Sequence, residues 1–271
     1  MKAIIVGGSS GMGLAAARRI AVGGGSVLLA SRDNEKLIRA AESIKESVGS
    51  GPGEVAIKTM DMTREDEVES FFGSLPQNSF NHLVISAAGR SYHKPFVEAD
   101  TGEFQNFFQS KFWGPMYCAR YGASRLKRPG SIVFFSGLLS RRPGVNCSPL
   151  AATNGAIEAL TRSLALELGP DLRVNCLSPG FVDTERFDHL DPETKTAMLE
   201  TTGASLPLGR VGRSEEIGHA VEYLLGNTFT TGVVLDVDGG HQVRQYASQS
   251  KDPFRKTGTK VSVDEGSPLQ S

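Results

Sequence analysis

A glycine-rich turn near the start of the chain has the composition of a phosphate-binding loop. Gly7-Gly8-Ser9-Ser10-Gly11-Met12-Gly13 follows a short apolar run and opens a helical pattern. Small residues allow a tight turn there, and the N–H groups at the start of a helix attract a pyrophosphate. A plain strand–helix turn has the same composition, but the position at the start of a β–α–β unit favours dinucleotide binding. The predicted contacts come from Gly7, Ser9, Ser10, Gly11, Met12 and Gly13.

The second apolar run ends at the position where a dinucleotide site binds the ribose of the adenosine. An NAD site would place an acidic residue there, about 20 residues beyond the glycines. Here Ser31 takes that place and Arg32 follows it. A guanidinium offers a rigid fork of donors to phosphate oxygens, so the pair favours the 2′-phosphate of NADP(H). The alternative is a solvated Arg32 beside a helix cap at Asp33 or Asn34.

Short apolar runs alternate with longer helical patterns along the chain. The runs predict strands at 3–6, 26–30, 54–60, 82–86, 131–135, 173–177 and 233–237. The longer patterns predict helices at 13–22, 35–47, 65–72, 104–125, 151–168 and 215–225. Near-continuous apolar strands in such an alternation predict an α/β fold of the Rossmann type, a doubly wound parallel sheet of seven strands with helices on both faces.

A chain of 271 residues is long enough for one large α/β domain. We expect a single NADP(H)-binding domain over residues 1–243, with a polar insertion around 183–209 that could serve as a substrate lid. Residues 244–271 are polar and rich in Ser, Lys and Gly. We expect them to form a loosely ordered tail, because they cannot bury enough apolar area to offset their ordering entropy.

Composition argues against several classes of partner. The formal charge is −1 without a large basic or acidic block, which argues against nucleic acid and anionic membranes. Cys118, Cys147 and Cys176 offer no zinc spacing and fit a reducing compartment. No metal site is expected. Because no apolar run approaches membrane-spanning length and the first run begins almost at Met1, we expect a cytoplasmic protein without a targeting peptide.

Further motifs, in their order and spacing, resemble the short-chain dehydrogenase/reductase family. After the glycine-rich turn these are Asp61-Met62-Thr63, Ser86-Ala87-Ala88-Gly89, Arg173–Gly180 with Phe181-Val182-Asp183-Thr184, Leu208–Gly212, Thr231-Gly232 and Asp238-Gly239-Gly240. The likeness covers roughly residues 2–243. It implies a nicotinamide-dependent oxidoreductase of a small molecule. It also implies a homodimer or homotetramer built through the helices at 104–125 and 151–168.

The resemblance also extends the cofactor site. In the family, an acidic residue after the third strand approaches the adenine, and a Pro-Gly segment with a nearby hydroxyl holds the nicotinamide carboxamide. Carried over by position, the implied cofactor contacts are Asp61, Met62, Ala87, Ala88, Gly89, Asn154, Pro179, Gly180, Val182 and Thr184.

The family's catalytic positions all differ here. In the family, a tyrosine protonates the carbonyl oxygen, a lysine four residues later binds the ribose, a serine orients the carbonyl and an asparagine holds a relay water. The tyrosine position falls on Leu150 and the lysine position on Asn154. The serine position falls on Gly137, beside Ser136, and the asparagine position on Lys111. The family's catalytic residues therefore cannot be carried over.

Lys111, Ser136 and Asn154 remain as candidates for catalysis. Lys111 could act as a charge partner or relay, or it could form an interior salt bridge or turn outward. Asn154 can still hydrogen-bond ribose hydroxyls. Ser136 could bind substrate or cap the end of a strand.

The loop after the fifth strand offers further polar groups. Arg141 and Arg142 could clamp an anionic group or lie in a solvated loop. Cys147 lacks an evident histidine base, which favours a small buried thiol over a nucleophile.

The missing proton donor limits the chemistry. A positioned general acid contributes about 10²–10⁴-fold, and leucine has no proton to give. An iminium needs no proton when the hydride arrives, and a conjugated C=C or C=O leaves a delocalised anion that water can protonate. We therefore expect an NADP(H)-dependent reductase of an activated or cationic acceptor.

Fungal indole-alkaloid enzymes in the family's wider circle, which reduce an iminium and guide a 4+2 cyclisation, are a precedent. The alternatives are a catalytically silent NADP(H)-binding protein, or a non-redox cyclase or isomerase that keeps the nucleotide as a structural element.

Overall fold

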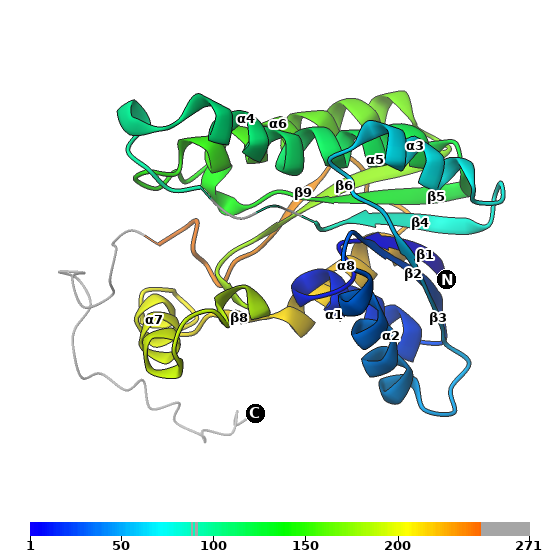
Figure 1. Ribbon diagram of the computed structural model, residues 1–271, viewed down its shortest axis with the longest axis horizontal. Helices are drawn as coiled ribbons and strands as arrows, with labels where there is room; N and C mark the ends of the chain where they lie inside the picture. Colours follow the sequence, from blue (N-terminus) through cyan, green and yellow to red (C-terminus); the bar gives the residue numbers. More distant parts are fainter. Residues whose placement is uncertain (88, 90–91, 245–271) are drawn as a thin grey trace, which may run out of the picture.

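A parallel sheet forms the centre of the computed structural model, which describes residues 1–87, 89 and 92–244 (Figure 1). In this part of the chain the sheet has seven strands in the order β3-β2-β1-β4-β5-β6-β9. Their bounds are β1 Lys2–Val6, β2 Ser26–Ser31, β3 Glu54–Thr59, β4 Phe80–Ile85, β5 Leu126–Phe135, β6 Leu172–Pro179 and β9 Val234–Val237. The order reverses between β1 and β4, which is where open α/β sheets bind their ligands.

Helices cover both faces of this sheet, as Figure 1 shows. One face carries α1 (Gly11–Val22), α2 (Asn34–Val48) and α8 (Ser214–Gly226). The other carries α3 (Glu65–Gly73), α4 (Thr101–Phe108), α5 (Gly114–Ala123) and α6 (Ser148–Glu167). The predicted doubly wound Rossmann-type fold is confirmed.

Alternate residues of each strand feed two separate cores, because successive side chains point to opposite faces of a sheet. On β1, Ile5 packs into the core that α1, α2 and α8 cover, together with Leu37. Its neighbour Ile4 packs into the opposite core with Phe72 and Phe134. Both faces of the strands are buried, so their sequences read as continuous apolar runs rather than alternating ones.

The fifth strand begins earlier than expected, at Leu126 rather than Ser131. Its first residues after Leu126, from Lys127 to Pro129, are exposed. Polar residues at an exposed strand end give no apolar signal, so the prediction began only where β5 enters the core.

The helix predicted over 104–125 is interrupted at its centre. Between α4 and α5 lies a π-helical turn, Gln109–Trp113, which contains Lys111. Pro115 has no N–H to donate to the carbonyl of Lys111, four residues earlier, so the regular hydrogen-bond ladder cannot run through this point. Wide turns of this kind often occur at functional sites.

The polar insertion has more structure than expected. It opens with β7 (Val182–Asp183), which pairs with β8 (Gly212–Arg213), and it contains α7 (Pro192–Ala204). Asp191 caps α7 by accepting the N–H of Thr194. Gly203 is the buried residue of this helix, so α7 has no apolar stripe for a sequence pattern to detect. A role as a substrate lid stays a prediction.

The predicted tail, residues 244–271, lies outside the described residues except for Arg244. Within those residues, no helix combines the length and the apolar character that a bilayer crossing needs.

A substitution in the core that contains Ile4, Phe72 and Phe134 tests the packing directly. Phe72 is fully buried, with its ring in an edge-to-face contact with Phe71 at 5.1 Å between centroids. We expect Phe72→Ala to lower the free energy of unfolding by about 3–5 kcal/mol in urea titrations, because a cavity remains where the ring was. Phe229 is fully exposed, and Phe229→Ala should change stability by no more than about 0.5 kcal/mol. Equal effects of the two substitutions would contradict the placement of α3.

Candidate active site

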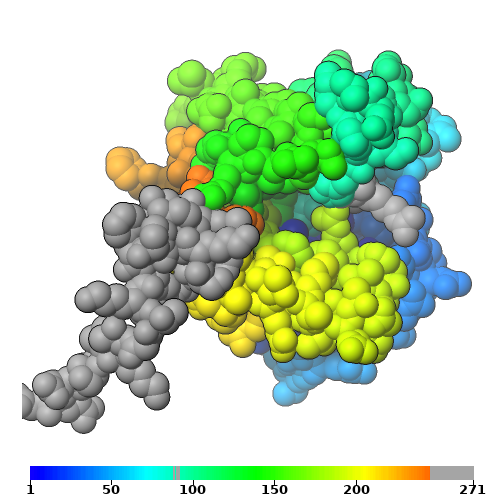
Figure 2. All heavy atoms as spheres, turned by 90° about the vertical axis from the view of Figure 1, so that its left-hand side faces the viewer, coloured from blue at the N-terminus to red at the C-terminus, as the bar shows by residue number. Residues whose placement is uncertain are grey.

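The segments predicted to bind cofactor and substrate meet at the carboxyl edge of the sheet. Figure 2 shows a hollow between the teal and green side of the molecule, which contains α4 and α6, and the yellow segment that contains α7. Atoms of the blue N-terminal segment are visible at its floor. The turns after β1, β4, β5, β6 and β9 all leave the sheet at this edge, because these strands run parallel.

The glycine-rich turn after β1 is packed too tightly for side chains. At Gly7, where φ is +85°, an added Cβ would lie 2.5 Å from the backbone N of Ala87. At Gly13 it would lie 2.2 Å from the carbonyl oxygen of Gly7. The contact at Gly7 brings the turn after β1 against the turn after β4. Ala88, another predicted cofactor contact, lies outside the described residues.

The N-terminus of α1 binds the side-chain carboxylate of Glu185, which lies far away in the sequence. The side chain of Ser10, the N-cap residue, makes no cap hydrogen bond. Instead the N–H of Gly11 donates to Glu185 Oε2 at 2.8 Å. A carboxylate here stands where a pyrophosphate oxygen would bind, so the chemistry of this helix end fits a dinucleotide. A pyrophosphate would have to displace Glu185.

The segment after β6 lies across from that helix end. An added Cβ on Gly180 would come within 2.6 Å of Asp238 Cα, so this backbone can run beside the segment after β9. Thr184 lies beside Gly11, since an added Cβ there would lie 3.6 Å from Thr184 Cβ. The structure therefore brings Thr184, one of the predicted cofactor contacts after β6, to the glycine-rich turn.

At the end of β2, the exposed Arg32 lies next to Asp33, the residue that caps α2. Asp33 caps α2 by accepting the N–H of Lys36 at 3.0 Å. Arg32 is exposed and makes no hydrogen bond or ion pair with another residue that the structure describes. The two interpretations of this segment are therefore compatible, because Asp33 does the capping and leaves the Arg32 guanidinium open to a phosphate.

Asp61 follows β3 and is held in one orientation. Its Oδ1 accepts the backbone N–H of Thr63 at 2.9 Å and the Thr63 hydroxyl at 2.8 Å. This leaves the second oxygen available for the amino group of an adenine. Its neighbour Met62 is buried, and its carbonyl oxygen would lie 2.9 Å from a Cβ added to Gly114.

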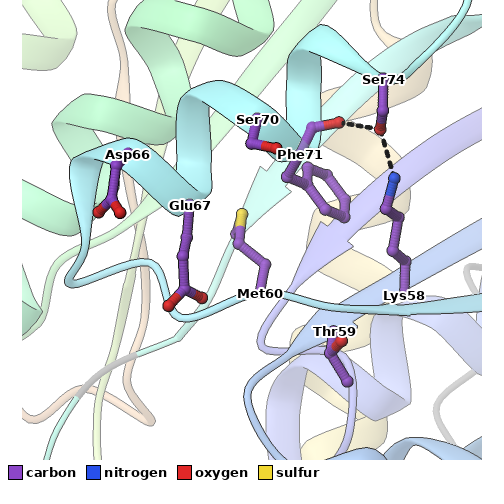
Figure 3. A pocket seen from close by; sticks show the side chains of 8 residues that line it. All are labelled: Lys58, Thr59, Met60, Asp66, Glu67, Ser70, Phe71 and Ser74. Carbon is purple, nitrogen blue, oxygen red and sulfur yellow. Dashed lines mark hydrogen bonds between the residues drawn. The ribbon is translucent and has the colours of Figure 1, made fainter.

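A separate hollow of about 340 Å³ lies beside α3, at the outer edge of the sheet (Figure 3). Its walls include Lys58, Met60, Glu67 and Phe71. The Lys58 ammonium donates to the hydroxyl of Ser74, which in turn donates to the carbonyl of Phe71. β3 is the edge strand farthest from β5 and β6, so this hollow is no part of the substrate cleft.

Two of the altered catalytic positions lie against each other. Asn154 is 2% exposed and lies one helical turn after Leu150 on α6. An added Cβ on Gly137 would lie 3.0 Å from Asn154 Nδ2. Asn154 Oδ1 is buried and has no hydrogen-bond partner among the described residues. Since an unpaired buried acceptor is costly, this oxygen calls for a donor such as a ribose hydroxyl.

Lys111 is buried rather than turned outward. Its Nζ donates to the carbonyl oxygens of Phe135 at 3.2 Å and Ser136 at 3.3 Å. No carboxylate pairs with it among the residues the structure describes, which corrects the salt-bridge and outward alternatives. Burial lowers the pKa of Lys111 to about 8, against an ordinary value of 10.5, and the Arg186 charge adds to the shift. The ammonium stands directly behind the Ser136–Gly137 peptide.

The Ser136 hydroxyl is engaged by a buried carboxylate. Its Oγ donates to Glu158 Oε1 at 3.1 Å, and Ser140 Oγ donates to the same oxygen at 2.6 Å. Arg141 completes the cluster with its Nε 3.6 Å from Glu158 Oε2. Ser136 is 5% exposed. The expectation that its hydroxyl binds substrate stays a prediction, and the bond to Glu158 leaves only the oxygen's acceptor capacity for such a contact.

Cys147 has a histidine neighbour that the sequence did not predict. Its Sγ lies 3.3 Å from His93 Nδ1, and the thiol donates to the carbonyl of Val145 at 3.2 Å. The expectation that Cys147 lacks a nearby histidine is wrong. Burial raises the pKa of the thiol, which keeps it protonated, so the interpretation as a small buried thiol still fits.

Three tyrosines of the described part of the chain have contacts of their own. The hydroxyl of Tyr92 accepts the N–H of Asp100 at 2.9 Å, and the hydroxyl of Tyr121 donates to Glu65 at 2.9 Å. Tyr117 stacks on Trp113 with 6.3 Å between centroids.

Comparison with known proteins identifies the family. The family model described as Enoyl-(Acyl carrier protein) reductase matches residues 6–242. Short-chain dehydrogenase/reductase ATR9 of Stachybotrys chlorohalonatus is 31% identical, over 88% of this chain and 95% of its own length. The protein therefore belongs to the short-chain dehydrogenase/reductase family, and its class is that of oxidoreductases.

Three solved structures are informative. A small-chain dehydrogenase in complex with NADPH is 31% identical, with a TM-score of 0.74, covering 90% of this chain and 99% of its own. The MalC reductase/Diels-Alderase of Malbranchea aurantiaca is 26% identical, with a TM-score of 0.81 and coverages of 89% and 96%. An NADPH-bound short chain oxidoreductase of Pseudomonas aeruginosa PAO1, described as containing an atypical catalytic center, is 25% identical, with a TM-score of 0.79 and coverages of 88% and 95%. The NADPH in two of these relatives supports the expected NADP(H) site.

The buried Lys111 predicts a specific pH dependence of stability. Below pH about 8 the folded protein carries the buried charge, whereas the unfolded chain keeps its proton up to about pH 10.5. The unfolded state therefore binds more protons between these values, and stability contributed at this site rises with pH across the window. In urea titrations from about pH 7 to about pH 10, wild type should gain stability relative to Lys111→Met, by at most about 1.4 kcal/mol per pH unit. If the difference in stability between wild type and Lys111→Met stays constant over this range, the burial of the Lys111 amine is contradicted.

Proposed function

We propose that this protein is an NADP(H)-dependent reductase that acts on an activated or cationic acceptor, an iminium or a conjugated C=C or C=O in a small organic molecule. One observation carries the proposal. Leu150 stands in the first turn of α6 at the family's tyrosine position, above an Asn154 that lacks the lysine's charge.

The cofactor would lie along the edge of the sheet from β2 to β6. Arg32 would hold the 2′-phosphate, Asp61 the adenine amino group and the Gly11 N–H the pyrophosphate. The unpartnered Oδ1 of Asn154 would accept a ribose hydroxyl, and Thr184 would hold the nicotinamide carboxamide. Bound NADPH supplies a hydride at this point, and the protein's part is to orient the acceptor and exclude water.

The surroundings of Leu150 define which acceptors react without a protein acid. The Ser136 hydroxyl is engaged by Glu158, and the Lys111 ammonium is engaged by two carbonyls. An iminium carbon that gains the hydride passes its π electrons to nitrogen, and the product is a neutral amine with no proton required. A conjugated acceptor gains the hydride at its β-carbon and leaves an enolate that water protonates. A simple ketone would leave an alkoxide with no donor.

The two unusual neighbours support this interpretation. One carries both a reductase and a Diels-Alderase activity in its name, and the other is an NADPH-bound oxidoreductase with an atypical centre. The second shows that a protein of this fold can bind NADPH and have an atypical catalytic centre. We also infer a homo-oligomer, supported by the exposed Trp113 between α4 and α5 and the exposed Leu166 on α6, and we keep the cytoplasm as its expected location.

The direct experiment follows NADPH oxidation with three acceptors, an N-methyl-dihydroisoquinolinium salt, an enone and a matched saturated ketone. We expect turnover with the first two and none with the ketone. Cofactor binding without any oxidation would identify a silent protein instead. A changed product with NADPH left intact would identify a non-redox enzyme.

A double variant tests the assignment of Leu150 and Asn154 to the missing pair. Leu150→Tyr combined with Asn154→Lys should gain ketone reduction, by about 10²-fold or more over wild type, because the phenol becomes a general acid. Failure to gain this activity, with fold and NADPH binding intact, would contradict the assignment. The single variant Leu150→Phe is the matched control, since it adds the ring without the proton.

The cofactor preference has its own test. We expect Arg32→Ala to weaken NADPH binding by about tenfold or more while NADH binding stays close to that of wild type, because the guanidinium contacts the 2′-phosphate alone. Arg39→Ala on α2, which removes an exposed arginine paired with Glu35, is the control. Fluorescence titration of both nucleotides provides the measurement. Equal weakening of the two would remove the 2′-phosphate contact.

A further inference from the structure

The adjacent arginines after β5 differ in how their charges are balanced. Arg141 forms an ion pair with Asp236 at 2.5 Å, and its Nε lies 3.6 Å from Glu158. Arg142 instead donates from Nη1 to the carbonyl oxygens of Gln242 at 2.9 Å and Arg244 at 2.5 Å. No carboxylate within the described residues pairs with Arg142. Its charge is therefore unbalanced, whereas that of Arg141 is neutralised.

A second unbalanced arginine lies beside it. Arg244 donates from Nη1 to the hydroxyl of Ser205, at the end of α7, and its Nε is buried without an acceptor among the described residues. Asp238, an acid in the same segment, already accepts the backbone N–H groups of Gly240 at 2.9 Å and Gln242 at 2.8 Å. The proximity of Arg142 contributes to a lowered pKa for Arg244, after desolvation, which is the larger cause. Two like charges are thus held together without a counter-ion in the described part of the chain.

Two further nitrogen atoms in this segment lack partners. Gln242 Nε2 and His241 Nδ1 are both buried and unpaired among the residues the structure describes. The amide nitrogen is a donor, and the imidazole nitrogen donates in the tautomer that carries its proton there. Buried donors without acceptors are costly, so this group of side chains is incomplete without a ligand that accepts hydrogen bonds.

The position of these residues separates them from Arg32, the proposed contact of the cofactor's 2′-phosphate. Arg142 follows β5, His241–Arg244 follow β9 and Ser205 ends α7, so all three segments border the carboxyl edge of the sheet. Figure 2 shows orange C-terminal residues between the green and yellow segments beside the hollow. Arg32 lies at the end of β2, near the opposite edge of the strand order.

We propose that Arg142, Arg244 and Gln242, with His241, bind an oxyanion, a carboxylate or phosphate group carried by the substrate. This rests on the proposed function, and it defines the substrate as an acidic molecule whose reducible group lies toward Leu150. The same chemistry could come from within the chain, because Asp252, Asp264 and Glu265 follow in residues 245–271. The test distinguishes these two sources.

The experiment measures anion binding to the full-length protein saturated with NADPH, so that the cofactor's own phosphate sites are filled. Inorganic phosphate and acetate are titrated by calorimetry into wild type, Arg244→Gln, Arg142→Gln and the control Arg120→Gln, which removes an exposed arginine on α5. We expect millimolar binding to wild type and to the control, weakened about tenfold or more in the other two variants. Unchanged NADPH affinity in each variant shows that the fold is retained.

A triple variant, Asp252→Asn with Asp264→Asn and Glu265→Gln, identifies the source. One result would be that wild type binds no anion, that the triple variant binds one, and that adding Arg244→Gln to the triple variant abolishes this binding. In that case the site exists and the chain's own carboxylates occupy it. If neither protein binds an anion, or if Arg244→Gln leaves binding unchanged, the site does not exist.

A second measurement connects the site to substrate. Among activated acceptors that prove to be reduced, a carboxylated member should lose kcat/KM about tenfold or more in Arg244→Gln, whereas its uncharged counterpart should not. If no acceptor is reduced, the proposed function fails while the calorimetric result still decides the anion site. If both acceptors lose activity equally, the oxyanion is not the substrate's.

Discussion

The close approach of the turns after β1 and β4 determines where every other part of the site can lie. An added Cβ on Gly7 would come within 2.5 Å of the backbone of Ala87. This contact depends on a left-handed glycine, and it places the glycine-rich turn directly against the turn after β4.

The buried carboxylate of Glu158 is the centre of a polar cluster at the end of β5. Lys111 binds the carbonyls at the end of β5, and Ser136 and Ser140 share one oxygen of Glu158. Arg141 links this carboxylate to Asp236 on β9. Networks of this kind rigidify a site when their members are satisfied. The cluster links the end of β5 to α6 and to β9.

The sequence predicted the parts of this structure that depend on local patterns. The strands emerged from continuous apolar runs, and Asp33 was correctly considered as a cap for α2. Helix α7 was missed because its buried face consists of one glycine, and the π-helical turn at Lys111 gave no signal other than Pro115. The bond of Gly11 to Glu185 and the Cys147–His93 contact join residues 174 and 54 positions apart. Such pairings depend on the completed fold, and no local spacing could reveal them. The unbalanced charges of Arg142 and Arg244 also depend on the completed fold. There Arg141 pairs with Glu158 and Asp236.

The central claim is that hydride reaches the acceptor without a proton from the protein. Single-turnover oxidation of bound NADPH by an iminium salt, compared in H₂O and D₂O, measures this directly. We expect the rate to be the same in both solvents and to fall when deuterium replaces the transferred hydrogen of the cofactor. A rate that falls in D₂O as well would show a proton moving in the same step. It would contradict an active site that works without a general acid.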